Sequence, residues 1–429
     1  MMTYEQALTA IHAHGRFGGK AGLERMRALL KVLGDPQDTL RFVHIAGTNG
    51  KGSTAALIAS VLGQAGFDTG LFVSPYVVDF CERIRVNDRN IPHEALSRIT
   101  ERVLAAEQQL DLPAGEAICE FEFTTACGLL YFAEKKCDIV VLEVGLGGRY
   151  DPTNVIKAPE CAVMCHVALD HMAVLGNTVE EIAQDKSHII KTGTTLVNYP
   201  EQTASVNEIL QARCAQVGAE YVQAYQPEIL REDIDGITCK IDGNTYDLRM
   251  IGHHQAYNAA TAYTVLQVLL RKRWRFHPSH ITAGFEIASM PARQEVIQHE
   301  PLLMIDGGHN EDGVRALCAT IDRYLPSGGI SLVLGMVTDK QYEACVKLLA
   351  RRADNIYTVQ PESPRALSSR ELATVVRKFS PYCNVCDCGD TVSGLKRALR
   401  YSAPDEVVIV CGSLYVAGEA KNALLSGMI

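Results

Sequence analysis

The sequence lacks long apolar runs and lacks an excess of basic residues. No uninterrupted apolar segment approaches the roughly 20 residues that span a bilayer. Residues 1–20 show no basic stretch followed by an apolar run, so we expect no signal peptide. Acidic residues outnumber basic residues by 50 to 41, giving a net charge of −9. This charge argues against nucleic acid and an anionic membrane as partners, and we expect a cytoplasmic monomer that acts on small molecules.

Cysteine is also sparse, with 14 among 429 residues. Cys161 and Cys165 lie in an apolar run and are expected to be small buried hydrophobic residues. Cys383, Cys386 and Cys388 form the only tight cluster, which could begin a zinc site, but no fourth Cys or nearby His completes it. We therefore expect reduced thiols.

The composition is that of a globular protein, with 47% apolar and 21% charged residues. The length exceeds that of one ordinary core, so we expect two domains. Short β-branched runs alternate with helical stretches, which predicts an α/β fold with a parallel sheet covered by helices. Strands are expected at 41–46, 69–73, 138–144 and 161–167, antiparallel hairpins at 229–250, and helices at 52–64, 255–270 and 280–288.

A second α/β series follows Pro291. We place the boundary between residues 293 and 294, so that the domains are 1–293 and 294–429. The strands of the second series are expected at 302–305, 331–334, 355–359 and 406–410.

The strongest local signal is HIAGTNGKGST at residues 44–54, where a strand leads into a glycine-rich loop and a helix follows. Converging backbone N–H groups and the helix dipole attract phosphate at such a point. Lys51 would neutralise the phosphates, and Ser53 could bind the magnesium that accompanies ATP. Gly52 separates the lysine from the hydroxyl, so the spacing differs from the usual P-loop, and a glycine-rich turn without ligand is the alternative.

Other candidate ligands follow expected strands. Glu143, ending an apolar strand before GLGGR, would lie at the ligand-binding edge of the sheet and fits a magnesium ligand better than a solvated turn residue. His171 follows the next strand, and Lys186 lies on a helix behind it; spacing alone favours a structural His and a surface Lys. Asp306 and His309, in DGGHN, end the first strand of the second domain, where a nucleotide can be clamped in an interdomain cleft.

Six segments together resemble one family. HIAGTNGKGS, SPYVVDFCERI, LEVGLGGRYDPTNV, LDHMAVLGNTVEEIAQDK, DGGHN and CGSLYVAGE resemble, in that order, motifs of the folylpolyglutamate synthase/dihydrofolate synthase family of the Mur ligase superfamily. LEVGLGGR is the most specific, because cell-wall Mur ligases share the phosphate loop but not this stretch. The resemblance implies a P-loop, Mur-ligase-like central domain with a mostly parallel sheet and a smaller, Rossmann-like α/β C-terminal domain.

The resemblance also implies roles for individual residues. Lys51, His171 and Lys186 match catalytic positions, and Lys186 matches a lysine that the family carbamylates with CO₂. Positions that match magnesium ligands are Ser53, Ser74, Glu143, His171 and Lys186. Positions that match ATP contacts are Asn49, Gly50, Lys51, Gly52, Ser53, Asn258, Arg293, Asp306 and His309. Positions that match the site of the pterin-bearing substrate are Gly22, Leu23, Arg83, Tyr150 and Pro152.

A few positions depart from the family pattern. Tyr76 stands where His is usual, Pro152 where Ala or Ser is usual, and Asp185, Ser187 and His188 differ around Lys186. None of these changes removes an implied metal ligand. Tyr76 and Pro152 bear on the preferred pterin and on polyglutamate length.

The function implied is an ATP-dependent amide ligase. The substrate carboxylate would attack the γ-phosphate of ATP, and the amino group of L-glutamate would then attack the acyl phosphate. Folate, and possibly dihydropteroate, would be the acceptor. A Mur-type peptidoglycan precursor ligase is the nearest alternative, and a nucleotide switch or kinase that makes no amide is another.

Overall fold

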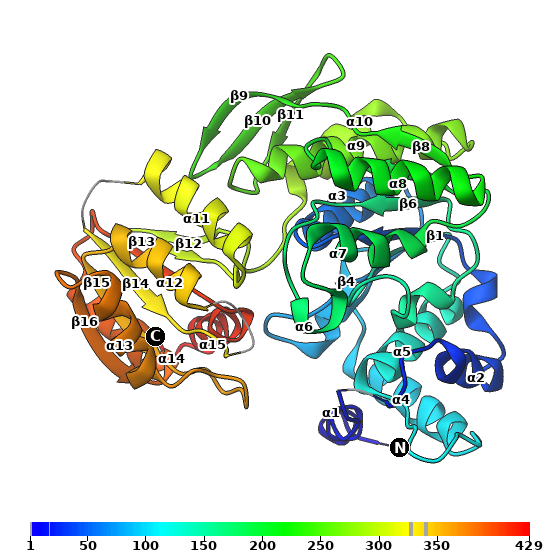
Figure 1. Cartoon of the computed structure of the whole chain (residues 1–429), viewed down its shortest axis with the longest axis horizontal. Coiled ribbons are helices and arrows are strands. Elements are labelled where there is room, and N and C mark those ends of the chain that lie inside the picture. The colour runs from blue at the N-terminus through cyan, green and yellow to red at the C-terminus, as the bar shows by residue number, and fades with distance from the viewer. Residues whose placement is uncertain (1, 17, 326–328, 339–341) are drawn as a thin grey trace. The chain divides into compact units, whose positions relative to one another are not determined.

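The computed structural model describes residues 2–16, 18–325, 329–338 and 342–429, which form two compact units (Figure 1). The first unit comprises Met1–Pro227 and Tyr257–Ala288, and the second comprises Glu228–Ala256 and Ser289–Ile429. Each unit has a mostly parallel sheet covered by helices, so the predicted α/β class is confirmed.

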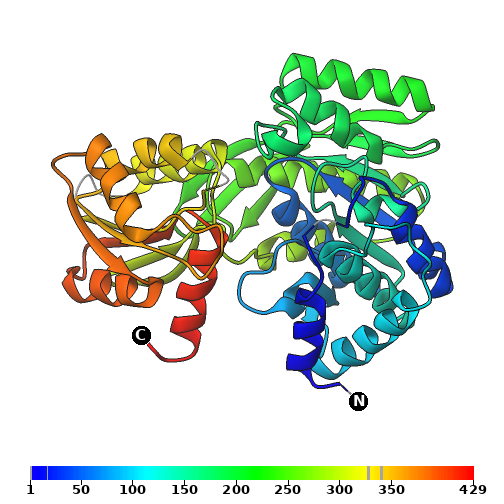
Figure 2. The same ribbon diagram turned by 60° about the horizontal axis from the view of Figure 1, so that its bottom comes forward.

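The first unit is built on an eight-stranded sheet (Figure 2). Its strands are β1 (Phe42–Ala46), β2 (Thr69–Phe72), β3 (Ile84–Val86), β4 (Arg89–Asn90), β5 (Ile139–Glu143), β6 (Cys161–Met164), β7 (Thr195–Asn198) and β8 (Glu220–Gln223). They lie in the order β4-β3-β2-β5-β1-β6-β7-β8, and only the β2–β3 and β3–β4 pairings are antiparallel. Strands β1, β2, β5 and β6 are buried along their whole length, as parallel strands covered on both faces are.

Helices cover both faces of this sheet. They are α1 (Tyr4–His12), α2 (Glu24–Val32), α3 (Lys51–Gln64), α4 (His93–Glu107), α5 (Glu120–Glu134), α6 (Met172–Leu175), α7 (Val179–Lys186), α8 (Ala204–Val217), α9 (His254–Arg271) and α10 (Pro278–Ile287). Short 3₁₀ helices are η1 (Pro36–Thr39), η2 (Phe80–Arg83), η3 (Pro152–Val155) and η4 (Ser187–Ile189).

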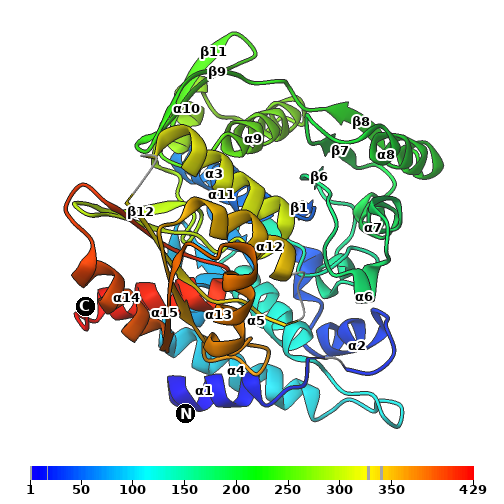
Figure 3. The same ribbon diagram turned by 60° about the vertical axis from the view of Figure 1, so that its left-hand side comes forward.

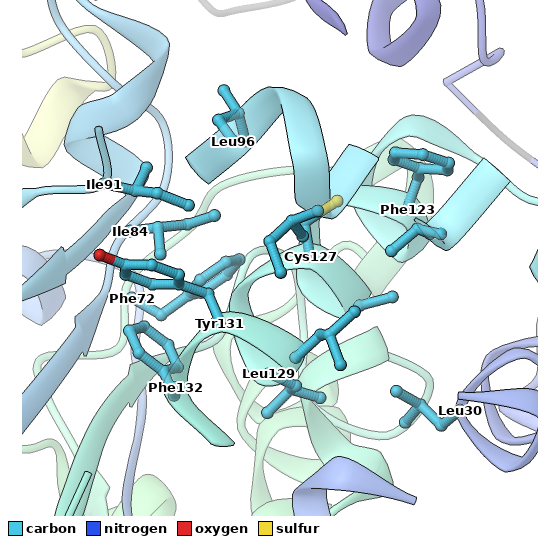
Figure 4. Close-up of a cluster of buried hydrophobic side chains, with 14 of the residues drawn as sticks. Leu30, Phe72, Ile84, Ile91, Leu96, Phe123, Cys127, Leu129, Tyr131 and Phe132 are labelled. Carbon is cyan, nitrogen blue, oxygen red and sulfur yellow. The ribbon is translucent and has the colours of Figure 1, made fainter. Parts of the chain in front are cut away.

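An apolar core fixes α5 against the sheet (Figure 4). Phe72 of β2 and Phe132 of α5 are buried in it. Glycines allow the close approach: a Cβ atom at Gly128 would lie 2.9 Å from the Phe72 ring, and one at Gly70 would lie 2.8 Å from the Phe132 ring. Truncating either phenylalanine to alanine should cost about 3–5 kcal/mol. This core fixes strand β5, whose last residue is Glu143.

The second unit carries two sheets (Figure 3). The antiparallel sheet β11-β10-β9 consists of β9 (Glu228–Asp233), β10 (Gly236–Ile241) and β11 (Asn244–Leu248). The larger sheet has β12 (Glu295–His299), β13 (Leu302–Ile305), β14 (Ile330–Leu334), β15 (Asn355–Val359), β16 (Asn384–Gly389) and β17 (Val407–Cys411), in the order β12-β13-β17-β14-β15-β16. Its helices are α11 (Glu311–Tyr324), α12 (Tyr342–Leu349), η5 (Ala350–Arg352), α13 (Ser369–Phe379), α14 (Thr391–Tyr401) and α15 (Leu414–Leu425).

The expected strands and helices are present within one to three residues of their predicted bounds. Strands β3, β4, β7, β8, β12 and β16 were not expected. The second α/β series begins with β12, two residues after the boundary that we propose at 293/294, and the compact second unit also takes in residues 228–256.

Membrane-spanning helices and paired cysteines are two features that the sequence does not predict. Among the described residues, no helix combines the length and apolar character that crossing a membrane requires. No disulfide joins any of the 14 cysteines, all of which lie within the described residues, and Cys386 and Cys388 lie with their sulfur atoms 3.6 Å apart on the edge strand β16.

Candidate active site

The glycine-rich loop joins the buried strand β1 to the N-terminus of α3. Gly47 has φ +149° and Gly50 has φ +85°, and both positions are closed to a side chain. A Cβ atom at Gly47 would lie 2.7 Å from Cβ of Cys165, and one at Gly50 would lie 2.3 Å from Oδ1 of Asn258. The loop therefore needs glycine at both positions, and it ends at a helix N-terminus that attracts anions.

Hydrogen bonds hold the loop in place. The Thr48 N–H donates to the His166 carbonyl at 2.7 Å, and the Thr48 hydroxyl donates to the Ala168 carbonyl at 2.9 Å. Lys51 Nζ donates to the Thr48 carbonyl at 3.1 Å. Thr48 and His166 were not among the predicted site residues, because these contacts join segments about 120 residues apart. Their effect is to fix the loop before any ligand binds.

Glu143 lies at the carboxyl end of β5, paired in register with Ile45 of β1. The side chain is buried, with 4% exposed, and accepts a hydrogen bond of 3.1 Å from the backbone N–H of Ser74. The Ser74 hydroxyl in turn accepts a hydrogen bond of 3.2 Å from Arg83. The structure thus brings together three of the predicted residues, Ser74, Arg83 and Glu143.

Lys186, the last residue of α7, is buried beside the phosphate loop. Its Nζ donates to the Gly47 carbonyl at 2.9 Å. Burial, followed by the nearby charge of Lys51, lowers the pKa of Lys186 to about 7. The burial of this side chain contradicts the surface lysine that spacing alone favours.

The GLGG segment after Glu143 packs directly against the end of α7. A Cβ atom at Gly147 would lie 2.4 Å from Oδ1 of Asp185, and one at Gly148 would lie 2.7 Å from the Lys186 carbonyl oxygen. These glycines let one backbone approach another, which explains their run in the sequence.

His171 follows β6 and has φ +51°, a left-handed conformation that is uncommon for a residue with a side chain. The backbone N–H of His171 donates to Asp170 Oδ1 at 2.7 Å, and the ring Nε2 lies 3.9 Å from Asp170 Oδ2. About a third of the imidazole is exposed. The imidazole therefore lies near a carboxylate and is partly exposed to solvent.

The residues expected to hold the pterin-bearing substrate occupy three segments. Gly22 and Leu23 precede α2, and α2 packs against η3, whose first residue is Pro152. Tyr150 is 45% exposed, with the Arg149 guanidinium 4.9 Å from its ring centroid. Arg83 is buried, and its guanidinium lies 5.1 Å from the ring centroid of Tyr76, which brings one of the departures from the family pattern beside a predicted substrate residue.

A buried polar network around Asp151, next to Pro152 of η3, was not predicted from the sequence. Asp151 accepts hydrogen bonds from the N–H groups of Leu146 at 2.8 Å and Thr153 at 3.0 Å, and from the Thr153 hydroxyl. His44 Nε2 lies 2.9 Å from that hydroxyl. Burial raises the pKa of Asp151. The D-x-T spacing, which makes Asp151 the cap of η3, was the available signal.

In the second unit, Asp306 follows β13 and is buried. It accepts hydrogen bonds from the N–H groups of Gly308 at 2.8 Å and Gln294 at 3.1 Å, and burial raises its pKa. Arg293, next to Gln294, stands between two residues with positive φ, Ala292 at +54° and Gln294 at +50°. Such strained backbone is common at functional sites.

The other predicted nucleotide residues are also located. His309 Nδ1 lies 3.0 Å from the Gly307 carbonyl oxygen, in the same segment as Asp306. Asn258, in α9, is buried beside Gly50 of the phosphate loop. The roles of all these site residues stay predictions.

The fold is that of a ligase built from Mur ligase domains. Residues 115–266 match the Mur ligase middle domain, and residues 292–414 match the Mur ligase glutamate ligase domain. The dihydrofolate synthase/folylpolyglutamate synthase of Bacillus subtilis is 34% identical over 431 residues, covering 98% of this chain and 99% of that protein. The folylpolyglutamate synthase of Lacticaseibacillus casei is 33% identical over 443 residues, covering 99% and 100%. The chain belongs to the dihydrofolate synthase/folylpolyglutamate synthase family.

Solved structures agree. The Thermotoga maritima folylpolyglutamate synthase superposes with a TM-score of 0.86 at 29% identity, covering 99% of this chain and 97% of that one. The Mycobacterium tuberculosis enzyme, complexed with ADP and AMPPCP, gives 0.87 at 27% identity, covering 98% and 97%. These relatives confirm the predicted family, fold and ATP-dependent ligase class, and they support a Mur-type peptidoglycan precursor ligase less well.

Proposed function

We propose that this chain joins the amino group of L-glutamate to a carboxylate of a folate, and of dihydropteroate, with ATP converted to ADP and phosphate. The observation that carries the proposal is the fixed phosphate loop at the N-terminus of α3, with the buried carboxylate Glu143 ending the strand beside it. The relatives, named for these two activities, support this choice of substrates.

The nucleotide would lie on the loop. Asn49, Gly50, Lys51, Gly52 and Ser53 would surround the ATP phosphates, and Asn258, Arg293, Asp306 and His309 would make the remaining contacts. The helix N-terminus and the Lys51 ammonium favour the negative charge that develops on the transferred phosphoryl group. The fixed loop lets these groups act without rearrangement, and relatives bound to ADP and AMPPCP support ATP as the cosubstrate.

The residues at the strand ends fit a magnesium ion. The hydroxyls of Ser53 and Ser74 and the carboxylate of Glu143 are hard oxygen donors of the kind that Mg²⁺ binds, and His171 would complete the set. Glu143 is 4% exposed and lies at the carboxyl end of β5, beside the strand that leads into the phosphate loop. Magnesium held there would neutralise charge on the ATP phosphates.

Lys186 would contribute as a carbamate. Its neutral amine adds to CO₂, forming an N–C bond and releasing one proton, and the product offers anionic oxygens toward a magnesium ion. A free ammonium there would be repelled both by Lys51 and by the metal. Burial, which favours the uncharged amine, supports this modification.

The acceptor would bind between α2 and the segment after β5, at Gly22, Leu23, Tyr150 and Pro152. Arg83 would meet an anionic group of the substrate. The substrate carboxylate would attack the γ-phosphate, and the glutamate amine would displace phosphate from the acyl phosphate. We further propose that the protein acts as a cytoplasmic monomer.

The test measures ADP release with ATP and magnesium, using dihydropteroate or a reduced folate, each with and without L-glutamate. We expect release with either acceptor only when glutamate is present. Glutamate-dependent release with the reduced folate but not with dihydropteroate would show that the chain does not act on dihydropteroate. Release that does not depend on glutamate would indicate a kinase or nucleotide switch. Release only with a nucleotide-linked peptide precursor would indicate a Mur-type enzyme.

A further inference from the structure

A second cluster of metal-binding side chains lies in the first unit, among residues to which no role is assigned above. It consists of Asp79, which precedes η2, Cys81 within η2, and His93, which opens α4. Their ligand atoms all lie within 4.8 Å of one another. We call these three residues the Asp79 cluster.

The geometry is close to that of a metal site. In a tetrahedral zinc site with bonds of about 2.0–2.3 Å, ligand atoms are about 3.3–3.8 Å apart. His93 Nε2 already lies 3.4 Å from Asp79 Oδ2. The Cys81 sulfur lies within 4.8 Å of the other two ligand atoms, so a movement of about 1 Å or less would bring it to the spacing of a tetrahedral site.

The ring of His93 packs against the ring of Tyr4. It stacks on Tyr4 of α1, with centroids 3.6 Å apart and an angle of 1° between the planes. The Tyr4 hydroxyl donates to Asp79 Oδ1 at 2.8 Å, so it orients the carboxylate as well. Groups that orient metal ligands in this way raise affinity.

The chemistry of the three donors selects the class of ion. A thiolate, an imidazole and a carboxylate suit a borderline-soft cation such as Zn²⁺, not Mg²⁺ or Ca²⁺. Thiolate and carboxylate together carry two negative charges, which balance a divalent ion. Burial, followed by the charge of Asp79, raises the pKa of the Cys81 thiol to about 12, so the metal must displace one proton on binding.

We propose that Asp79, Cys81 and His93 bind one Zn²⁺ ion, with solvent at the fourth position. His93 is 56% exposed and gives the ion a route from solvent, whereas Cys81 is buried behind it. The site is separate from the magnesium ligands proposed above and contains a thiol, which they lack.

An ion in the Asp79 cluster would also affect Arg83, which is a predicted substrate residue. Asp79 caps η2 through the Cys81 N–H, and η2 ends at Arg83, which donates to Ser74. An ion bound to Asp79 and Cys81 would hold η2 against α4. We therefore expect Zn²⁺ to raise the thermal stability of the protein.

The test uses Co²⁺ as a spectroscopic substitute for Zn²⁺, added to the reduced full-length protein. We expect a thiolate-to-cobalt absorption band that saturates at one ion per chain and disappears when Zn²⁺ is added. Cobalt at a magnesium site gives no such band, since no thiol is present there. The result is therefore independent of whether the proposed ligase function holds.

Three variants decide the assignment. Cys81→Ser should lose the band, and His93→Ala, at an exposed position, should weaken Co²⁺ binding more than about tenfold. The matched control replaces Cys386 and Cys388, the other close thiols, with serine and should keep the band. A band that survives in Cys81→Ser, or that disappears only in the control, overturns the proposal. If Cys81→Ser fails to fold, unchanged Co²⁺ affinity in His93→Ala overturns it equally.

Discussion

The ε-amino group of Lys186 donates a 2.9 Å hydrogen bond to the carbonyl oxygen of Gly47. Gly47 is the residue at which β1 gives way to the phosphate loop, and Lys186 ends α7, so this contact ties the two segments together. The amine is buried and lies near a second cation, Lys51. Burying the Lys186 amine beside another cation destabilises the folded protein. Such a costly arrangement indicates a role in the reaction.

Replacing Lys186 with alanine should make the enzyme nearly inactive. Acetate should partly restore ADP release, because a small carboxylate can fill the vacated oxygen positions. Lys186→Met, which fills the space, should be equally inactive and should not respond to acetate. High-resolution density that shows a bare amine at Lys186, with nucleotide and magnesium bound, would refute the carbamate. Activity that returns with bicarbonate after CO₂ depletion would support it.

Replacing Lys51 with alanine should abolish ATP turnover while leaving the fold intact. Lys51 is only partly buried at the start of α3, so the change in unfolding free energy should be within about 1 kcal/mol. Lys157→Ala is the control, because its ion pair with Asp38 is highly exposed and contributes little. Steady-state ADP release within a few-fold of wild type in Lys51→Ala would remove the loop from the mechanism.

Replacing Glu143 with glutamine should lower activity by orders of magnitude. The amide keeps the size of the side chain and can still accept the hydrogen bond from Ser74, but it loses the charge that a magnesium ion needs. Excess substrate should not restore activity. Glu134→Gln, on the more exposed face of α5, should be near wild type. A magnesium titration that is identical in Glu143→Gln and wild type would contradict the assignment.

Alanine at two glycines should have opposite effects on stability. At Gly148 a Cβ atom would lie 2.7 Å from the Lys186 carbonyl oxygen, so Gly148→Ala should destabilise the protein by about 1–3 kcal/mol and lower activity. Gly63 lies inside α3 with open space around it, so Gly63→Ala should stabilise by about 0.5–1 kcal/mol. Denaturant unfolding measures both changes, and two shifts of the same sign would contradict this packing.

The stability contributed by His14 should depend on pH. The hydrogen bond of 3.0 Å between its Nε2 and Glu107 raises the pKa of His14. A raised pKa means that the contribution is fully present below the unfolded value of about 6.5 and is lost as pH rises through the folded value. His14→Gln should therefore destabilise the protein more at pH 5.5 than at pH 8.5, by less than about 1 kcal/mol after allowance for solvent. An equal effect at both pH values would rule out this linkage.

Much of the fold could be predicted because buried parallel strands are continuous apolar runs. FVHIA and IVVLE identify β1 and β5 on composition alone. TLVN of β7 is just as buried but is short and follows Thr192-Gly193-Thr194, and β16 lies at a sheet edge with polar and cysteine residues, so neither was recognised. The antiparallel hairpins were found from Asp-Gly turns.

The candidate site was predictable in part. Glycine runs and charged residues at strand ends gave the phosphate loop and Glu143. The contacts of Thr48 with His166 and of Lys186 with Gly47 join residues that are far apart in sequence, and no local pattern encodes such a pair. The burial of Lys186 was unexpected because lysine is ordinarily solvated, although Lys186 shares one face of α7 with the buried Ile182 and Ala183.

The packing of Gly147 and Gly148 against Asp185 and Lys186 sets a rule for engineering. Suppose that the 145–152 loop is exchanged with that of a relative in order to change the accepted pterin. The exchange would replace only one of two segments that pack closely against each other. The residues around Lys186 depart from the family pattern here, so a foreign loop would meet a surface for which it was not selected. A productive graft would carry residues 185–188 with it as one cassette.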